Sequence, residues 1–187
     1  VASVEEVGRM LGPAMHSLFK LKEAKARKKA GKWDELLDAN LVDTEGLQKA
    51  LAQAAAANMD PARFLVEKLG IGRADVERSL SLFYNCEFFR FTGKEQIPQD
   101  LRGRLRADFL KKVCAVPVER RGGQLVIVID DPTDIGRTDA LRNIDPNSDI
   151  LWMIGFRDEI SGFVEHAYGQ RNDLGNILKE LSSEEGT

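Results

Sequence analysis

The sequence predicts an α+β protein in which an all-helical repeat lobe is followed by a small sheet-and-helix lobe with the element order αββαβα. Three observations support this fold class. Helix caps and apolar residues spaced three to four apart run through the first 84 residues, an apolar pattern recurs there at an offset of 29 residues, and short β-rich runs alternate with helical runs after Tyr84. At 187 residues, 43% apolar and 30% charged, the composition is close to that of an average soluble globular protein.

Residues that cap helices mark the repeat lobe. Asp43 or Thr44 is expected to cap the longest helix, and Asp60 the next one, with Pro61 at its first position, where a missing N–H costs nothing. The predicted helices pass through residues 36–37, cover residues 44–56, begin at residue 61 and cover residues 73–83. The first 84 residues are therefore predicted to be helical throughout.

Short apolar runs bounded by turn residues predict four strands, at 87–91, 113–118, 125–129 and 150–154. Gly122 and Gly123 are expected to close a hairpin between the second and third strands. Pro117 cannot donate a ladder hydrogen bond, so it belongs at an edge or a bulge. The uninterrupted apolar character of the third and fourth runs predicts strands that are buried on both faces.

Two helices are predicted around these strands. One is expected to begin at Pro98, because apolar residues follow it at four-residue spacing, namely Leu101, Leu105 and Phe109. The other covers residues 157–168. The predicted domains are a basic amphipathic segment at 1–30, the helical repeat lobe at 31–84, an α/β lobe at 85–169 and a polar linker or tail at 170–187.

The repeat consists of a short helix, a turn and a longer helix. Neither copy could bury its apolar stripe alone, so the two copies are expected to pack together. A plain four-helix core explains the same pattern without any ligand. The matched pairs are Leu36 with Leu65, Leu37 with Val66, Val42 with Ile71, Leu47 with Val76 and Leu51 with Leu80.

The repeats, the run VPVERRGGQLVIVIDDPTD and the later run ILWMIGFRDEISGFVEHAYG together resemble the amino-terminal domain of type II secretion and type IV pilus assembly ATPases. The resemblance spans roughly residues 32–169, and the strand, Gly-Gly turn, apolar strand and Asp-Asp-Pro-Thr-Asp succession is its most specific part. It implies a domain that docks the ATPase onto an inner-membrane platform protein. In some members of this family, paired 24-residue repeats bind cyclic di-GMP.

The nucleotide-binding form of the repeat resembles this sequence only in its apolar positions. Asn40 and Leu69 stand where that motif has glycine, and its arginine is missing from both copies, with Lys32 and Arg63 as the nearest basic substitutes. A guanidinium reaches guanine or phosphate in a fork, and glycine allows close backbone approach, so this loss disfavours the ligand. The candidate positions for cyclic di-GMP are Lys32, Leu36, Leu37, Leu41, Val42, Leu47, Leu51, Arg63, Leu65 and Val66.

No phosphate or magnesium site is predicted. Gly93 and Lys94 imitate the end of a P-loop, but Glu95 follows them instead of the Ser or Thr that binds Mg²⁺. The acidic pair at the end of the third strand imitates a metal-binding acid. The structural alternative is favoured there: Asp131 is expected to cap the next helix, with Pro132 at its first position.

No zinc site, disulfide or catalytic arrangement is predicted either. Cys86 and Cys114 lack a CxxC motif and a nearby histidine, while His16 and His166 lie 150 residues apart, neither with a partner at metal-ligand spacing. A reducing, cytoplasmic setting follows. No apolar run approaches the roughly 18 residues that predict a membrane span, and the amino end lacks a secretory signal.

The stretch from Lys20 to Lys32 holds seven basic residues on a helix predicted to end near Gly31. As a solvated helix face it needs no partner. Alternatively, it contacts anionic lipid head groups or an acidic partner. The net charge of -3, and the lack of an aromatic platform beside these residues, argue against nucleic acid.

The predicted function is therefore docking or regulation, with no enzyme in this chain, no metal and no cofactor of its own. The resemblance implies the cytoplasmic domain of an inner-membrane platform protein and the chain's own downstream ATPase core as partners, with ATP bound only in that core. The expected location is cytoplasmic, with peripheral contact at the inner face of the inner membrane through Lys20–Lys32. The alternative hypothesis is a receptor that holds cyclic di-GMP through its two repeats.

Overall fold

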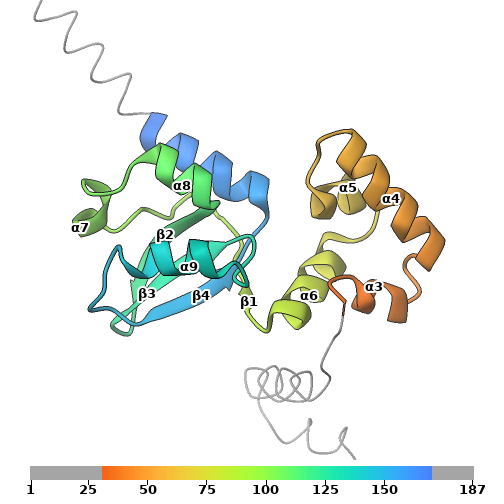
Figure 1. The fold of residues 1–187 in the computed structure, drawn as a ribbon, viewed down its shortest axis with the longest axis horizontal. Helices are drawn as coiled ribbons and strands as arrows, with labels where there is room; N and C mark the ends of the chain where they lie inside the picture. The colour runs from red at the N-terminus through yellow and green to blue at the C-terminus, as the bar shows by residue number, and fades with distance from the viewer. Residues whose placement is uncertain (1–30, 170–187) are drawn as a thin grey trace, which may run out of the picture.

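The computed structural model describes residues 31–169. The predicted basic segment at 1–30 and the predicted tail at 170–187 lie outside the described residues, as does His16. The described chain has a helical part (residues 31–84) and a sheet part (residues 85–169), which lie side by side in Figure 1. The division of the chain into domains stays a prediction.

The helical part contains α3 (Asp34–Asp38), α4 (Thr44–Ala56), α5 (Pro61–Glu67) and α6 (Arg73–Tyr84). The cap of α5 is the predicted Asp60, and the cap of α4 is Asp43, one of its two predicted candidates. The Asp43 carboxylate accepts a hydrogen bond from the Gly46 N–H at 2.7 Å, and the Asp60 carboxylate accepts from the N–H groups of Ala62 and Arg63 at 2.9 and 3.1 Å. These bonds pair N–H groups that have no partner inside the helix.

The two repeat units pack crosswise, because α3 contacts α6 and α4 contacts α5. The matched residues Leu36 and Leu65 are both fully buried, and Leu47 and Val76 are buried as well. The prediction that the units share one core is confirmed. We call this core the helical core; it also includes Ile154 and Phe156 from the sheet part.

The sheet has the order β1-β4-β3-β2, with β1 (Glu87–Phe88), β2 (Ala115–Arg121), β3 (Gln124–Ile129) and β4 (Ile150–Ile154). The strands β1, β4 and β3 are parallel, and β2 pairs antiparallel with β3 through a turn in which Gly122 and Gly123 have φ of 56° and 84°. Pro117 lies on the edge strand beside a β-bulge, so both of its predicted environments are found.

Two strand predictions were wrong in their details. The strand predicted at 87–91 has only two residues, and the one predicted to begin at residue 113 begins at Ala115, because Val113 ends a helix. The strand β3 is fully buried from Leu125 to Ile129, whereas the first three residues of β4 are half-buried. The short β1 pairs only with the end of β4, so the start of β4 has no strand on that side.

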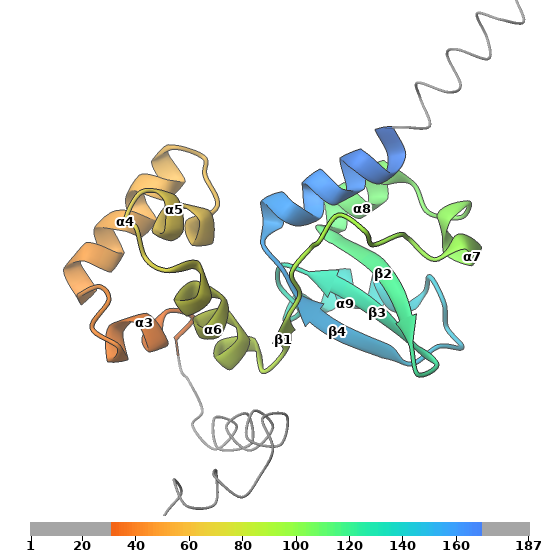
Figure 2. The same ribbon diagram turned by 180° about the vertical axis from the view of Figure 1, so that it is seen from behind.

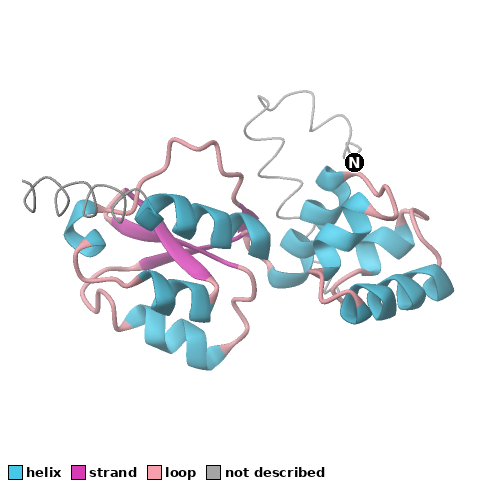
Figure 3. Ribbon diagram, turned by 90° about the horizontal axis from the view of Figure 1, so that it is seen from above, coloured by secondary structure: helices cyan, strands magenta, loops and turns pink. Residues whose placement is uncertain are grey.

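The sheet part also contains α7 (Gln99–Arg102), α8 (Ala107–Val113), α9 (Ile135–Arg142) and a final helix over residues 157–169. In Figures 1 and 3 the strands lie between α9 and the final helix. Figure 2 shows the final helix alongside α8 from behind. The order αββαβα is found, with its first helix divided in two.

The prediction of a single helix from Pro98 through Phe109 was wrong, because two short helices, α7 and α8, take its place. The chain leaves the helix at Gly103 and is extended at Arg106, with φ -105° and ψ 141°. Glycine costs a helix interior about 1 kcal/mol relative to alanine. Leu101 and Leu105 are nevertheless both buried, so the four-residue spacing marked the core side of the chain and not a continuous helix.

Candidate functional site

Each repeat unit has a left-handed residue at, or next to, the position where the nucleotide-binding motif has glycine. Asn40 adopts the left-handed region with φ 53°, at the position where the motif has glycine. In the second unit Leu69 stands at that position, but the left-handed residue is the following one, Gly70, with φ 70°. Beside the first turn lies a hollow of about 290 Å³, lined by Leu37, Asn40, Val42, Asp43 and Thr44.

A carboxylate already occupies the helix start that an anion would use. The positive end of α4 faces this hollow, and the Asp43 carboxylate there accepts the Gly46 N–H at 2.7 Å. The second unit has Gly72 at the corresponding position and Asp75 in the first turn of α6. Helix starts attract phosphate through free N–H groups, so an acidic cap disfavours phosphate at the first turn.

The structure does not bring the two candidate cations together around a ligand site. The Lys32 ammonium lies 5.5 Å from the Trp33 ring centroid and 5.4 Å from that of Tyr84. Arg63 donates to Glu67 at 2.7 Å and to Asp158 of the final helix at 3.0 Å. Both cations therefore have partners within the chain.

Most of the apolar candidate positions are explained by packing. Leu36, Leu47 and Leu65 are buried, and the other residues of the set except Leu41 pack against the helical core while half-buried, namely Leu37, Val42, Leu51 and Val66. Leu41 is exposed. The arrangement accounts for the repeat as a shared core, and binding through these residues stays a prediction.

A cluster of charged residues that the sequence analysis missed joins the helical part to the sheet part. Arg73 of α6 donates to Glu77 at 2.7 Å, and its guanidinium forms a two-bond pair with Glu159 of the final helix at 2.6 and 3.0 Å. Arg90 binds the other oxygen of Glu77, whose side chain is only 6% exposed. The i,i+4 spacing of Arg73 and Glu77 was the only local signal of this cluster.

The acidic pair at the end of β3 is structural. Asp130, 11% exposed, accepts from Arg137 at 2.7 Å and from Arg157 at 2.8 and 3.1 Å. The predicted cap at Asp131 was wrong: Asp131 accepts from the N–H and hydroxyl of Thr133, which makes a turn. Asp134 caps α9 instead, accepting the Arg137 N–H at 3.0 Å.

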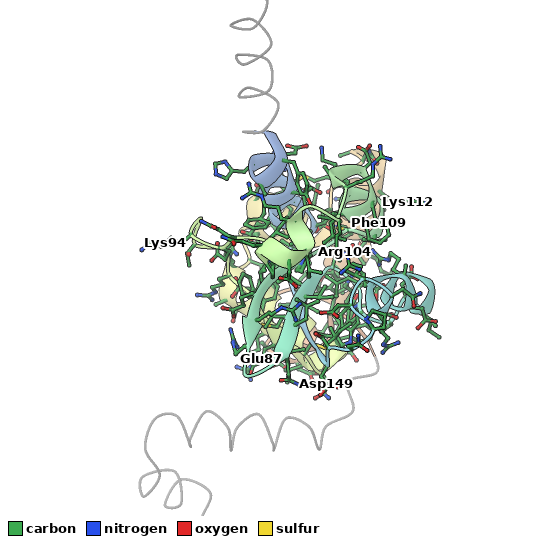
Figure 4. All side chains as sticks on the ribbon, turned by 90° about the vertical axis from the view of Figure 1, so that its left-hand side faces the viewer. Glu87, Lys94, Arg104, Phe109, Lys112 and Asp149 are labelled. Atoms are coloured by element: carbon green, nitrogen blue, oxygen red, sulfur yellow. The ribbon has the colours of Figure 1, made fainter. Side chains whose placement is uncertain are left out.

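The turn that resembles a P-loop binds a carboxylate of the chain itself. The carboxylate of Glu95 accepts from the N–H groups of Thr92 and Gly93 at 2.8 and 3.0 Å, which are the donors that a phosphate would need. Lys94 extends away from this turn at the end of the sheet part (Figure 4). Within residues 31–169, no group of three His, Cys, Asp or Glu side chains could hold a metal ion.

Both cysteines are free thiols. Burial, with the nearby charge of Asp130, raises the pKa of the Cys114 thiol to about 12, and burial raises the pKa of Cys86 as well. A thiol reacts as its thiolate, so neither side chain is an activated nucleophile. No helix in the described part of the chain is long and apolar enough to cross a membrane.

The α8 helix carries exposed cations on either side of an aromatic side chain. Figure 4 labels Arg104, Phe109 and Lys112 on one side of the view, and Arg106 immediately precedes α8. Phe109 is half-buried, while Arg106 and Lys112 are exposed and form no ion pair with another described residue. Because residues three apart share a helix side, these two cations flank Phe109.

Fold and site together define a class of protein: a helical repeat module attached to a small mixed sheet. The charged clusters of this module form ion pairs within the chain. Residues 84–174 match the model of the MshEN domain. The MshEN domain is a non-catalytic amino-terminal domain of secretion and pilus ATPases, which confirms the predicted family and the prediction of no enzyme in this chain. The match begins at Tyr84, after the repeats.

Solved structures share the fold. A structure of MshE with cdg is 17% identical with a TM-score of 0.56, and the alignment covers 75% of this chain and 100% of that one. The amino-terminal domain of XpsE is 23% identical with a TM-score of 0.50, covering 76% of this chain and 94% of that one. No curated protein matches the chain.

Proposed function

We propose that this chain is a docking domain that attaches a secretion or pilus assembly ATPase core to the cytoplasmic domain of an inner-membrane platform protein. The observation that carries the proposal is the MshEN match over residues 84–174. The XpsE amino-terminal domain, a domain of the same fold, supports it. Peripheral membrane contact through Lys20–Lys32 and an ATPase core after residue 187 remain predictions that accompany this proposal.

The surface that fits docking best is the face formed by Arg106, Phe109 and Lys112. Phe109 supplies apolar area, and two unpaired cations beside it suit an acidic partner surface. A lipid surface is a poorer match, because the two basic residues supply only about 1 kcal/mol each and the acidic Asp108 lies between them.

The test is a titration of the chain with the isolated cytoplasmic domain of the platform protein. The double variant Arg106→Glu and Lys112→Glu is expected to bind at least about tenfold more weakly, because reversed charges repel an acidic partner. The control, Lys49→Glu with Lys68→Glu, reverses two exposed charges of the helical part and should bind like the unmodified chain. Absence of binding by the unmodified chain would contradict the docking function itself.

A second candidate function is cyclic di-GMP reception. The solved structure of MshE with cdg and the left-handed turns at Asn40 and Gly70 favour it. The acidic cap Asp43 and the internal partners of Lys32 and Arg63 disfavour it. In a calorimetric titration we expect no binding, whereas a dissociation constant of about 1 µM or tighter, lost in the variant Lys32→Ala with Arg63→Ala, would establish the receptor.

A further inference from the structure

We propose that an electrostatic latch, built on Arg63 and Arg73, holds the helical part against the sheet part. This latch sets the orientation of the repeats relative to the sheet part. The inference rests on the proposed docking function only for its consequence, because a docking domain must present its surfaces in a defined direction. The geometry of the latch stands on the contacts themselves.

In the latch, arginines of two repeat helices form ion pairs with carboxylates in the first turn of the final helix. Arg63, at the start of α5, binds Asp158 at 3.0 Å, and Arg73, at the start of α6, holds both oxygens of Glu159 at 2.6 and 3.0 Å. Arg157, the first residue of that helix, binds Asp130 at the end of β3. The first turn is therefore tied to the sheet by one residue and to the repeats by the next two.

Arg73 is the central residue because its position is fixed from three sides. Its Nε donates to Glu77, which Arg90 of the sheet part also binds, and its guanidinium lies 4.8 Å from the Phe156 ring centroid. The side chain is thus aligned before it meets Glu159, so little further order is lost when that pair forms. The charges of Arg73 and its carboxylates reinforce one another, and the arginine pKa is raised accordingly by Glu159.

The joint between the two parts also has an apolar component. Phe156 is buried and packs edge to face on Phe88 with ring centroids 4.9 Å apart, and together with Ile154 it completes the helical core. Only Asn85 and Cys86 link α6 to β1, and Asn85 has the left-handed φ of 52°. The short connection and this apolar contact keep the two parts adjacent, and the charged pairs fix how the final helix is oriented on the repeat helices.

The ion pairs of the latch are exposed to solvent, so salt ions or another acidic surface can compete for its arginines. The side chains of Arg63 and Arg73 are 50% and 42% exposed, and Asp158 is 45% exposed. Ion pairs that remain in contact with water weaken with added salt, since the screening length falls to about 3 Å at 1 M. An acidic partner surface could bind these arginines in place of Asp158 and Glu159, which would release the helical part.

The experiment measures the distance between spin labels at Gln48→Cys on α4 and Gly162→Cys on the final helix, in a Cys86→Ser background without any platform protein. Both positions are exposed, and a Cβ at Gly162 meets no neighbouring atom. Cys114 is buried and does not take the label. We expect one narrow distance distribution in the unmodified latch, and at least about a twofold broadening in Arg63→Ala with Arg73→Ala or at 1 M salt.

The matched control is Arg78→Ala, which removes an arginine of the same helix that pairs with Glu35 inside the helical part. Its distribution should stay narrow. If the arginine variant does not fold, Asp158→Asn with Glu159→Gln opens the latch from the other side and keeps Arg73 on Glu77. Distributions unchanged in both latch variants would overturn the proposal and leave docking untouched, because no partner is present in this measurement.

Discussion

Replacing Leu65 by alanine is expected to lower the free energy of unfolding by about 3 kcal/mol, because the side chain is fully buried in the helical core and its loss leaves a cavity that the neighbouring helices cannot fill. For a chain of this length the melting temperature should fall by about 9 °C. Leu36→Ala, at the matched position of the first unit, should cost a similar amount, since Leu36 is also fully buried.

Leu69→Ala is the matched control for this prediction. Leu69 lies four residues after Leu65, carries the same side chain and is 37% exposed, so its truncation should change the free energy of unfolding by less than about 0.5 kcal/mol. Chemical denaturation followed by circular dichroism measures both variants. Equal effects at the two positions would show that the repeat does not form the crosswise core described above.

The second large effect is expected at Asp130. Asp130→Asn keeps the shape of the side chain but removes the charge that Arg137 and Arg157 share, and it places an amide N–H₂ against one of them. We expect a loss of about 2 kcal/mol and a melting temperature lower by about 6 °C. The loss stays below that of a fully buried pair, because Arg157 is 58% exposed and regains water.

Asp139→Asn provides the comparison. Asp139 also pairs with an arginine, Arg142, at 3.0 Å, but its side chain is 61% exposed, so the expected change is less than about 0.5 kcal/mol. Thermal unfolding of the two variants decides between a structural carboxylate and a ligand-binding one. An Asp130→Asn variant as stable as the unmodified chain would contradict the structural role of this carboxylate.

Local patterns predicted the helical part well. The bounds of α4, the caps at Asp43 and Asp60 and the sharing of one core by both repeat units agree with the structure, because a cap and an apolar stripe involve residues only a few positions apart. The strand β4 was also predicted with its bounds, and the hairpin at Gly122 was predicted from its two glycines. Each of these features depends on neighbours in the sequence.

The errors arose where two local signals competed. Asp131 and Asp134 both fit the pattern of a helix cap, and the structure uses Asp134 because Asp131 makes its own turn with Thr133. The spacing of Leu101 and Leu105 suggested one helix, but a turn at Gly103 brings both side chains to the core equally well. Periodicity identifies the buried side of a segment more reliably than its backbone conformation.

The candidate ligand residues show the same limit. The sequence indicated that Lys32 and Arg63 were the nearest cations to the repeat starts, but only the folded chain shows that Arg63 meets Asp158, a residue 95 positions away. Arg73 pairs with Glu159, 86 positions away, and no sequence pattern outside α6 indicated this pair. Side chains that meet across such separations are brought together by packing alone.

By itself, then, the sequence determined the α+β class, the repeat, the bounds of α4 and β4 and the resemblance to secretion ATPase domains, because caps, apolar periods and short motifs act over a few residues. Only the tertiary structure decided which charges pair, that Phe156 of the sheet part completes the helical core, and that the first turn of the final helix is held by two repeat helices. Those contacts depend on how the helical and sheet parts pack, and packing is a property of the whole chain.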